Sequence, residues 1–226
     1  MGKKIDLPQS IQVEISDEFE AIEKLYALLD AGSGGYSLAV NAEKIIRLSS
    51  DLSFRSIFTG ASILICDGVG LNIYSRMKFQ KVNWPEIVVR EAAKNRWRCL
   101  IIGGDEMTHI RAAQGMFNQY GLDVTCSVNG YSSLEYYHSI IKRHSPDIVF
   151  IGLGSPKQEL LSQRFLIDFP NVFFVNCGGA LEVFSGYKKR APKFIVESNF
   201  EWLYRLIQQP RRFGRYVKLF RIFFIR

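Results

Sequence analysis

Short apolar runs alternate with longer amphipathic segments along the first 180 or so residues of the chain. Most of the apolar runs are continuous, as expected of strands that are buried on both faces of a parallel sheet. The amphipathic segments repeat their apolar residues at helical spacing. This pattern predicts strands at residues 37–40, 62–66, 98–102, 123–128, 148–152 and 172–176, and helices at residues 18–30, 42–50, 87–95, 107–120, 133–144 and 158–169.

Strands and helices that take turns predict an α/β fold with a mostly parallel, Rossmann-like sheet flanked by helices. The 226 residues are enough to bury a sizeable core. We expect an α/β domain over residues 1–190 and a C-terminal helical, basic appendage over residues 191–226. Within the appendage a helix is predicted at residues 201–208, Pro210 breaks it, and a helical pattern resumes from Arg211.

Charge separates the two parts of the chain. From Lys188 to Arg226 there are 11 Lys or Arg and 2 acids, whereas the other 187 residues have 18 and 20. Residues 211–226 combine this charge with aromatic side chains, which favours an anionic membrane surface over a nucleic acid as the partner. On a helical wheel most aromatic and basic residues fall on opposite faces, although Ile222 and Ile225 lie off the apolar face. The alternative is that the aromatic residues pack on the α/β domain.

Three features that the sequence lacks indicate the cellular compartment. The N-terminus has no apolar leader segment, and no apolar run approaches the roughly 20 residues that span a bilayer. The four cysteines form no CxxC pair and read as small core residues. We therefore expect a cytoplasmic protein, peripheral on the inner face of the membrane.

Glycine and polar residues follow nearly every predicted strand. Parallel sheets bind ligands beyond the carboxyl ends of their strands, and glycine there lets backbone N–H groups approach a phosphate. A single cluster is explained by a tight turn, whereas several on one edge favour a nucleotide-type site. The clusters are Asn41, Asp67-Gly68-Val69-Gly70, Gly103-Gly104-Asp105, residues 152–159 and Cys177-Gly178-Gly179-Ala180.

Asp67 is the leading candidate for chemistry, because a rigid strand would present its carboxylate at the edge as a general base. The alternative is an Asx-type turn that caps the next helix. Gln158 carries an amide that can bridge a donor and an acceptor on a ligand. Glu159, in the first turn of the same helix, is explained by matching of the helix dipole. Glu182 is either a ligand of ribose hydroxyls or a solvated helix residue.

Several chemistries have no motif here. The sequence contains no G-x-x-x-x-G-K-[ST], G-x-S-x-G or G-x-G-x-x-G pattern, and its three histidines lack metal-ligand spacing. No D-x-D pair is present to hold a divalent metal on a diphosphate. We predict no metal site and no cofactor, so backbone amides and arginines would have to neutralise a bound diphosphate.

At these residues the chain resembles the WecG/TagA/CpsF glycosyltransferase family, from Asn41 to Arg212. Each motif is weak alone, but their order and spacing are specific. The matching motifs are Asn41-Ala42-Glu43, Asp67-Gly68-Val69-Gly70, Pro146-Asp147, Gly152-Leu153-Gly154-Ser155-Pro156-Lys157-Gln158-Glu159, Gly178-Gly179, Ser185-Gly186, Arg190-Ala191-Pro192, Glu201-Trp202-Leu203-Tyr204-Arg205-Leu206 and Gln209-Pro210-Arg211-Arg212.

The resemblance implies an inverting, metal-independent transfer of a sugar from a nucleotide diphosphate, in this interpretation UDP. The acceptor would be a sugar on a membrane lipid diphosphate, and the appendage would dock at the membrane and help to complete the active site. Asp67 would be the catalytic base. The donor site would include Asn41, Gly104, Gln158, Gly178, Gly179 and Glu182, and the acceptor or diphosphate would meet Lys81, Glu86, Arg190, Arg205, Arg211, Arg212 and Arg215.

The sequence departs from the family pattern beside the expected sugar pocket. Ala39 stands where relatives commonly have Thr, and the Arg-x-Thr-Gly-x-Asp stretch appears as Lys81-Val82-Asn83-Trp84-Pro85-Glu86. The transferred sugar, the linkage and the oligomeric state therefore stay open. Two other functions are weighed: a non-catalytic nucleotide- or nucleic-acid-binding module with a basic arm, and a soluble α/β enzyme such as a methyltransferase with an oligomerisation helix.

Overall fold

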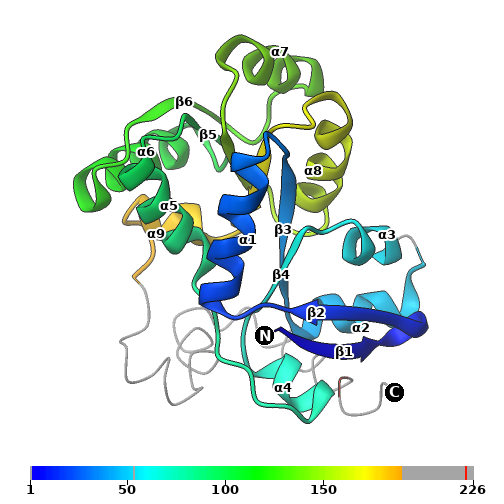
Figure 1. Ribbon diagram of the computed structural model, residues 1–226. Helices are drawn as coiled ribbons and strands as arrows, with labels where there is room; N and C mark the ends of the chain where they lie inside the picture. Colours follow the sequence, from blue (N-terminus) through cyan, green and yellow to red (C-terminus); the bar gives the residue numbers. More distant parts are fainter. Residues whose placement is uncertain (1, 53, 190–221, 223–226) are drawn as a thin grey trace.

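A six-stranded, all-parallel sheet forms the centre of the computed structural model, which describes residues 2–52, 54–189 and 222 (Figure 1). Its strand order is β4-β3-β8-β7-β5-β6. The predicted α/β fold is therefore confirmed. The strands are β3 (Gly35–Val40), β4 (Ile63–Cys66), β5 (Cys99–Gly103), β6 (Val124–Val128), β7 (Ile148–Gly152) and β8 (Phe173–Asn176).

All six predicted helices are present as well, with bounds that shift by at most three residues. They are α1 (Glu18–Asp30), α2 (Ala42–Ser50), α5 (Trp84–Asn95), α6 (Glu106–Tyr120), α7 (Leu134–His144) and α8 (Lys157–Asp168). Side-chain caps explain several starts. Asp17 and Glu20 form a capping box before α1, while Asn41 and Asp105 accept hydrogen bonds from backbone N–H groups of α2 and α6.

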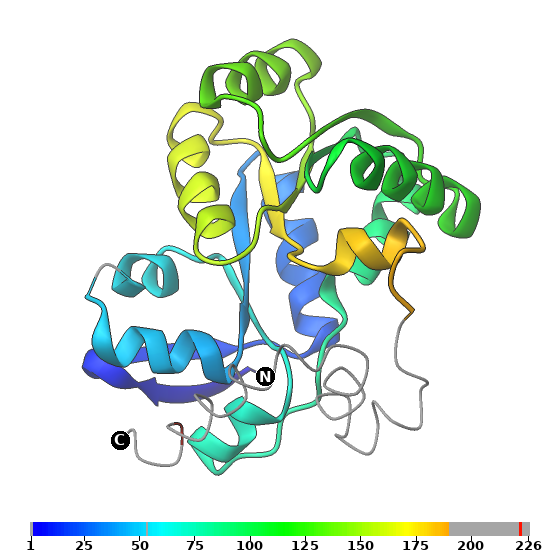
Figure 2. The ribbon, with the colours of Figure 1, turned by 180° about the vertical axis from the view of Figure 1, so that it is seen from behind.

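Helices cover both faces of the sheet, and the strand side chains alternate between them. Ile63 and Ile65 of β4 face a core shared with α1, α5, α6 and α9 (Ala180–Phe184). Leu64 and Cys66 face the opposite side, toward α2, α3 (Phe54–Thr59) and α4 (Val69–Ser75). Seen from behind, α8 and α2 lie on the face opposite α1 (Figure 2). Within the described residues, no helix is both long and apolar enough to cross a membrane.

An N-terminal hairpin, which the strand pattern above did not include, protects the β4 edge. Strands β1 (Lys3–Leu7) and β2 (Ile11–Ile15) pair antiparallel, and every second residue of β2 is buried. The backbone N–H of Ser16 donates to the carbonyl of Leu64 at 2.8 Å, so the chain leaving the hairpin runs beside β4. Figure 1 shows the hairpin beside α2 and α3, where its apolar residues join their core.

One residue of the basic tail is also described. Ile222 is 4% exposed and belongs to the apolar cluster of the hairpin, α2 and α3. On the helical wheel this residue lay off the predicted apolar face. At this position the tail packs on the α/β domain. The predicted helices of the appendage and its aromatic face lie outside the described residues.

At the amino ends of β5 and β7, Asp147 accepts three hydrogen bonds from Arg98, one from its backbone and two from its guanidinium. The backbone N–H of Arg98 lies 2.8 Å from Oδ2, and the guanidinium lies 2.9 Å from Oδ1. Partial burial raises the pKa of Asp147, but the hydrogen bonds and charge of Arg98 outweigh it, so the pKa lies below the ordinary 3.8. A lowered carboxyl pKa stabilises the folded state above the unfolded pKa, and this contribution is lost as the pH falls through the folded pKa.

We therefore expect Asp147→Asn to lower the thermal midpoint at neutral pH, because the ion pair between Arg98 and Asp147 at the two strand ends is lost. The difference from the wild type should shrink as the pH falls below 3.8, where the wild-type carboxylate is itself protonated. Thermal unfolding followed by circular dichroism between neutral and acid pH measures both. A difference that is the same at every pH would contradict the role of the charge.

Candidate active site

Most of the predicted site residues that the structure describes lie along one edge of the sheet. Because all six strands run parallel, their carboxyl ends share this edge. In spatial order, Asp67 follows β4, Asn41 follows β3, Gly178 and Gly179 follow β8, the segment ending at Glu159 follows β7, and Gly104 follows β5. The topology thus brings together residues that lie far apart in sequence.

Asp67 is held at the end of β4 with its side chain partly open to solvent. Its backbone N–H donates to the carbonyl of Val40 at 2.9 Å. Asn41 Nδ2 donates to Oδ2 of Asp67 at 3.3 Å, and Lys81 Nζ lies 3.7 Å from Oδ1. The carboxyl side chain is 39% exposed. A carboxylate that is fixed by the backbone, paired with a cation and accessible has the properties of a general base.

The neighbouring Cys66 is no competing nucleophile. Burial, with a smaller effect from the Asp67 carboxylate, raises the pKa of the Cys66 thiol to about 12. Burial likewise raises the pKa of Cys177 to about 12. Both thiols are protonated at neutral pH, and a thiol reacts as its thiolate. The two cysteines therefore behave as core residues, as the sequence predicted.

Two helices begin side by side behind Asp67. Gly68 has φ 95°, a conformation that favours glycine, and it precedes α4. A Cβ added to Gly70 would collide with Cβ of Ala42 and lie 2.9 Å from its backbone nitrogen. The first turns of α2 and α4 are therefore in direct contact. This close approach fixes Asn41 and Asp67 relative to each other.

Residues 81–86 are divided between the site and the core. The backbone N–H of Val82 donates to the carbonyl of Cys66 at 3.0 Å, which places Lys81 beside Asp67. Trp84 is 1% exposed and belongs to the core under α5. Glu86 accepts from Asn83 and pairs with Arg90, both at 2.5 Å. Of this segment, Lys81 lies at the candidate base, whereas Trp84 fills the core.

Gln158 and Glu159 are buried beneath the edge. Gln158 Nε2 donates to Glu159 Oε1 at 3.1 Å, and Gln158 Oε1 accepts from the backbone N–H of Gly178 at 3.2 Å. Glu159 is completely buried and pairs with Lys44 at 2.9 Å. Dipole matching, the explanation taken from the sequence, therefore accounts for only part of the environment of Glu159. Sequence reasoning missed Lys44, whose one local signal is a lysine within an otherwise apolar helix face.

The turn after β8 carries the remaining predicted donor residues. Gly178 has φ 49°, a value that non-glycine residues seldom adopt. Glu182 is 42% exposed and forms an ion pair with Lys188. Both the ribose-binding and the solvated interpretation of Glu182 agree with this position. Gly104 has φ 73°, and its carbonyl accepts from the backbone N–H of Gly130 at 2.8 Å.

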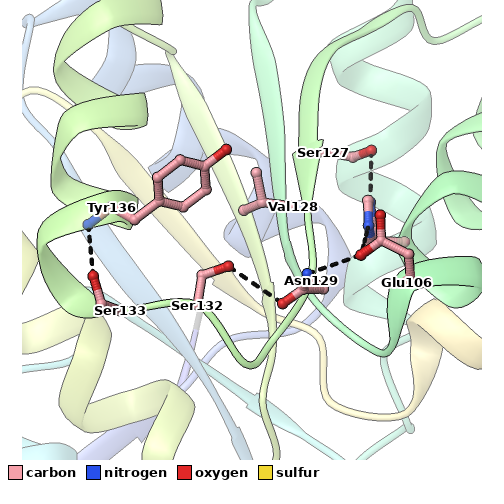
Figure 3. A pocket seen from close by; sticks show the side chains of 8 residues that line it. Glu106, Ser127, Val128, Asn129, Ser132, Ser133 and Tyr136 are labelled. Carbon is pink, nitrogen blue, oxygen red and sulfur yellow. Dashed lines mark hydrogen bonds and ion pairs between the residues drawn. The ribbon is translucent and has the colours of Figure 1, made fainter.

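A hollow of about 330 Å³ lies at the β6 end of the same edge (Figure 3). His109 is 5% exposed, and its Nδ1 lies 2.9 Å from the hydroxyl of Ser127. Asn129 Nδ2 donates to Glu106 at 2.9 Å. Sequence reasoning missed this hollow, although Asn129-Gly130 after β6 is one more polar and glycine cluster. The lining residues are Glu106, His109, Ser127, Val128, Asn129, Ser132, Ser133 and Tyr136.

The arginines expected at the acceptor or diphosphate lie outside the described residues. They are Arg190, Arg205, Arg211, Arg212 and Arg215. In the part of the chain that is described, no group of three or more His, Cys, Asp or Glu side chains is arranged to hold a metal ion.

The fold and this edge define a Rossmann-like α/β protein with a polar candidate site at the strand ends. Residues 9–226 match the Glycosyl transferase WecG/TagA/CpsF family. The match covers nearly the whole chain, so the protein belongs to this family and is a glycosyltransferase of bacterial cell-surface polysaccharide synthesis.

The contact of α2 with α4 generates a prediction. Gly70→Ala should lower the free energy of unfolding by about 1–3 kcal/mol, the usual cost of overpacking, and should lower glycosyl transfer because Asp67 moves with the turn. Denaturant titration and an activity assay measure the two effects. Adding Ala42→Gly removes one of the colliding methyl groups and should recover part of both. Full stability of Gly70→Ala would show that the helices separate freely.

Proposed function

We propose that the protein is an inverting, metal-independent glycosyltransferase that moves a sugar from UDP to a polyprenyl-diphosphate-linked sugar acceptor. The observation that carries this proposal is the partly exposed Asp67 carboxylate between Asn41 and Lys81, on the edge that also carries the Gly178-Gly179 turn. Membership in the family gives the class of reaction. It favours an enzyme over the non-catalytic binding module.

In the proposed reaction Asp67 takes the proton of the acceptor hydroxyl. The acceptor oxygen attacks the anomeric carbon from the face opposite the diphosphate, a new C–O bond forms, and the bond to UDP breaks with its electron pair. The configuration at the anomeric carbon is therefore inverted. Asn41 and Lys81 orient the base, while glycines at the strand ends let the diphosphate approach the backbone.

The remaining residues divide between the two substrates. The donor would meet Gly104, Gln158, Gly178, Gly179 and Glu182, with Gln158 acting through its hydrogen bond to the Gly178 backbone. The acceptor diphosphate would meet Lys81, Glu86 and the arginines that begin with Arg190. Because the acceptor is a lipid, the basic residues 211–226 would dock on the anionic inner face of the membrane.

If Asp67 is the base, Asp67→Asn should lower kcat by roughly 10²-fold or more, the usual scale for a lost general base. Affinity for UDP should change little, because the substitution keeps the shape of the side chain. Turnover is measured with a panel of UDP-sugars on a synthetic polyprenyl-diphosphate acceptor, and affinity by calorimetry. Asp168→Asn, at the far end of α8, is the matched control and should leave both unchanged. Near-native turnover of Asp67→Asn would remove Asp67 from the mechanism.

The tail is best tested by replacing Arg211, Arg212 and Arg215 with Gln, because Ile222 is buried in the domain and deletion would remove it. Each basic residue near an anionic surface contributes about 1 kcal/mol, so the triple variant should bind anionic vesicles roughly 10²-fold less tightly. Vesicle sedimentation measures this loss.

The control for the tail changes the exposed body residues Lys94, Lys142 and Arg143 to Gln, with the same loss of charge. It should bind vesicles normally. If the arginines only dock the protein, high lipid concentration should restore turnover, whereas turnover stays low if they also neutralise phosphate charge. Native vesicle binding by the triple variant would exclude a membrane role for these arginines.

A further inference from the structure

Lys44 lies at the centre of a series of polar contacts beneath the site. Its backbone N–H donates to Asn41 Oδ1 at 3.1 Å, and the other end of that amide, Nδ2, donates to Asp67 at 3.3 Å. Its side chain reaches Glu159, and Nζ lies 2.9 Å from both Glu159 Oε1 and the carbonyl of Ala39. One residue therefore both orients the partner of the candidate base and anchors a buried carboxylate.

The contacts continue from Glu159 to the turn after β8. Glu159 Oε1 also accepts from Gln158 Nε2 at 3.1 Å, and Gln158 Oε1 accepts from the Gly178 backbone at 3.2 Å. The chain of contacts thus joins the ends of β4, β3 and β8 to the first turn of α8. Its two ends are the candidate base and the proposed donor turn.

Stability alone is a poor explanation for this ion pair. The side chains of Lys44 and Glu159 are 6% and 0% exposed, and Glu159 Oε2 has no hydrogen-bond partner among the described residues. Burying two charges costs about as much as their attraction returns, so apolar residues of similar volume stabilise such a site equally well. An ion pair differs from apolar packing in fixing direction and distance.

We propose that Lys44 and Glu159 are positioning residues that hold Asp67 and the Gly178-Gly179 turn at a fixed separation. Both side chains are buried, so the proposal gives them no contact with the substrates. The assignment of substrates to the two ends rests on the function proposed above, whereas the mechanical link between them does not.

The decisive variant is Lys44→Met with Glu159→Leu, which replaces the charges by apolar groups of similar size and is expected to keep a native thermal midpoint. If the pair only stabilises the fold, this variant is fully active. If the pair positions the site, kcat falls roughly 10-fold or more and UDP binds more weakly, because small displacements of reacting groups cost up to about 10²-fold. Native kcat and native UDP affinity would overturn the proposal.

A double-mutant cycle tests whether the effect of Lys44 on UDP affinity is transmitted through Gln158. Lys44→Met should weaken UDP binding in the wild-type background but change it less than about 2-fold in a Gln158→Ala background, where the link to Gly178 is already broken. Equal losses of UDP affinity in both backgrounds would contradict the proposed link from Lys44 to Gly178. Glu159→Gln keeps the side-chain volume and gives a second folded variant, in which native kcat and affinity would also count against the proposal.

Hydrogen exchange measures, in the absence of substrate, how firmly the two ends of the link are held. The amide of Gly178 and the turn at Asp67 should exchange faster in the apolar double variant, because their held geometry is released. Lys24→Met breaks a surface ion pair of the same 2.9 Å length and is the matched control, with unchanged exchange and turnover. Unchanged exchange at Gly178 in the double variant would overturn the proposal. Faster exchange in the double variant, found together with a wild-type protein that transfers no sugar from UDP, would instead defeat the proposed function and leave the link intact.

Discussion

Parallel pairing of six strands, five of which are almost wholly buried, is the constraint on which the rest of the structure depends. A strand covered on both faces must satisfy its backbone within the sheet, and parallel neighbours require a crossover after each strand. Every crossover here begins at the same edge, so residues that follow different strands become neighbours. Asn41 and Gly178 illustrate this, because β3 and β8 pair directly although 137 positions separate the two residues. Polar side chains gather at this edge because it is where the backbone leaves the sheet.

The apolar pattern predicted this part of the fold well because it reports the same burial that makes the sheet. Ile148–Gly152 is a run of five residues with no room for a polar face, and the strand has the predicted bounds. The elements that were missed carry weaker signals. The hairpin alternates apolar and polar residues over only five positions per strand, and α3, α4 and α9 have five to seven residues each. Such short elements depend on tertiary packing more than on their own periodicity.

The sequence predicted those site residues whose place depends on the end of a strand. It did not predict those whose environment depends on a partner far away in the sequence. Asp67 and Gly178 end strands, so topology alone places them on the edge. Glu159 is buried as an ion pair with Lys44, which lies 115 positions earlier in the sequence and belongs to another helix. No local pattern encodes that pair. Trp84 is the opposite case. It belongs to a segment that was expected to approach the substrates, but its side chain is buried in the core.

Charge balance at the edge connects the α/β domain to its tail. Three lysines at or beneath the edge are each paired with a carboxylate: Lys44 with Glu159, Lys81 with Asp67 and Lys188 with Glu182. A cation that already neutralises a carboxylate has less attraction left for a diphosphate. The proposed leaving group gains negative charge as its bond to the sugar breaks, and that charge needs donors which the paired lysines supply only in part. The 10 basic residues after Lys188 are the chain's concentrated source of positive charge. In the proposed mechanism the domain supplies the base and the geometry, while the tail supplies both membrane attraction and the counter-charge for the diphosphate.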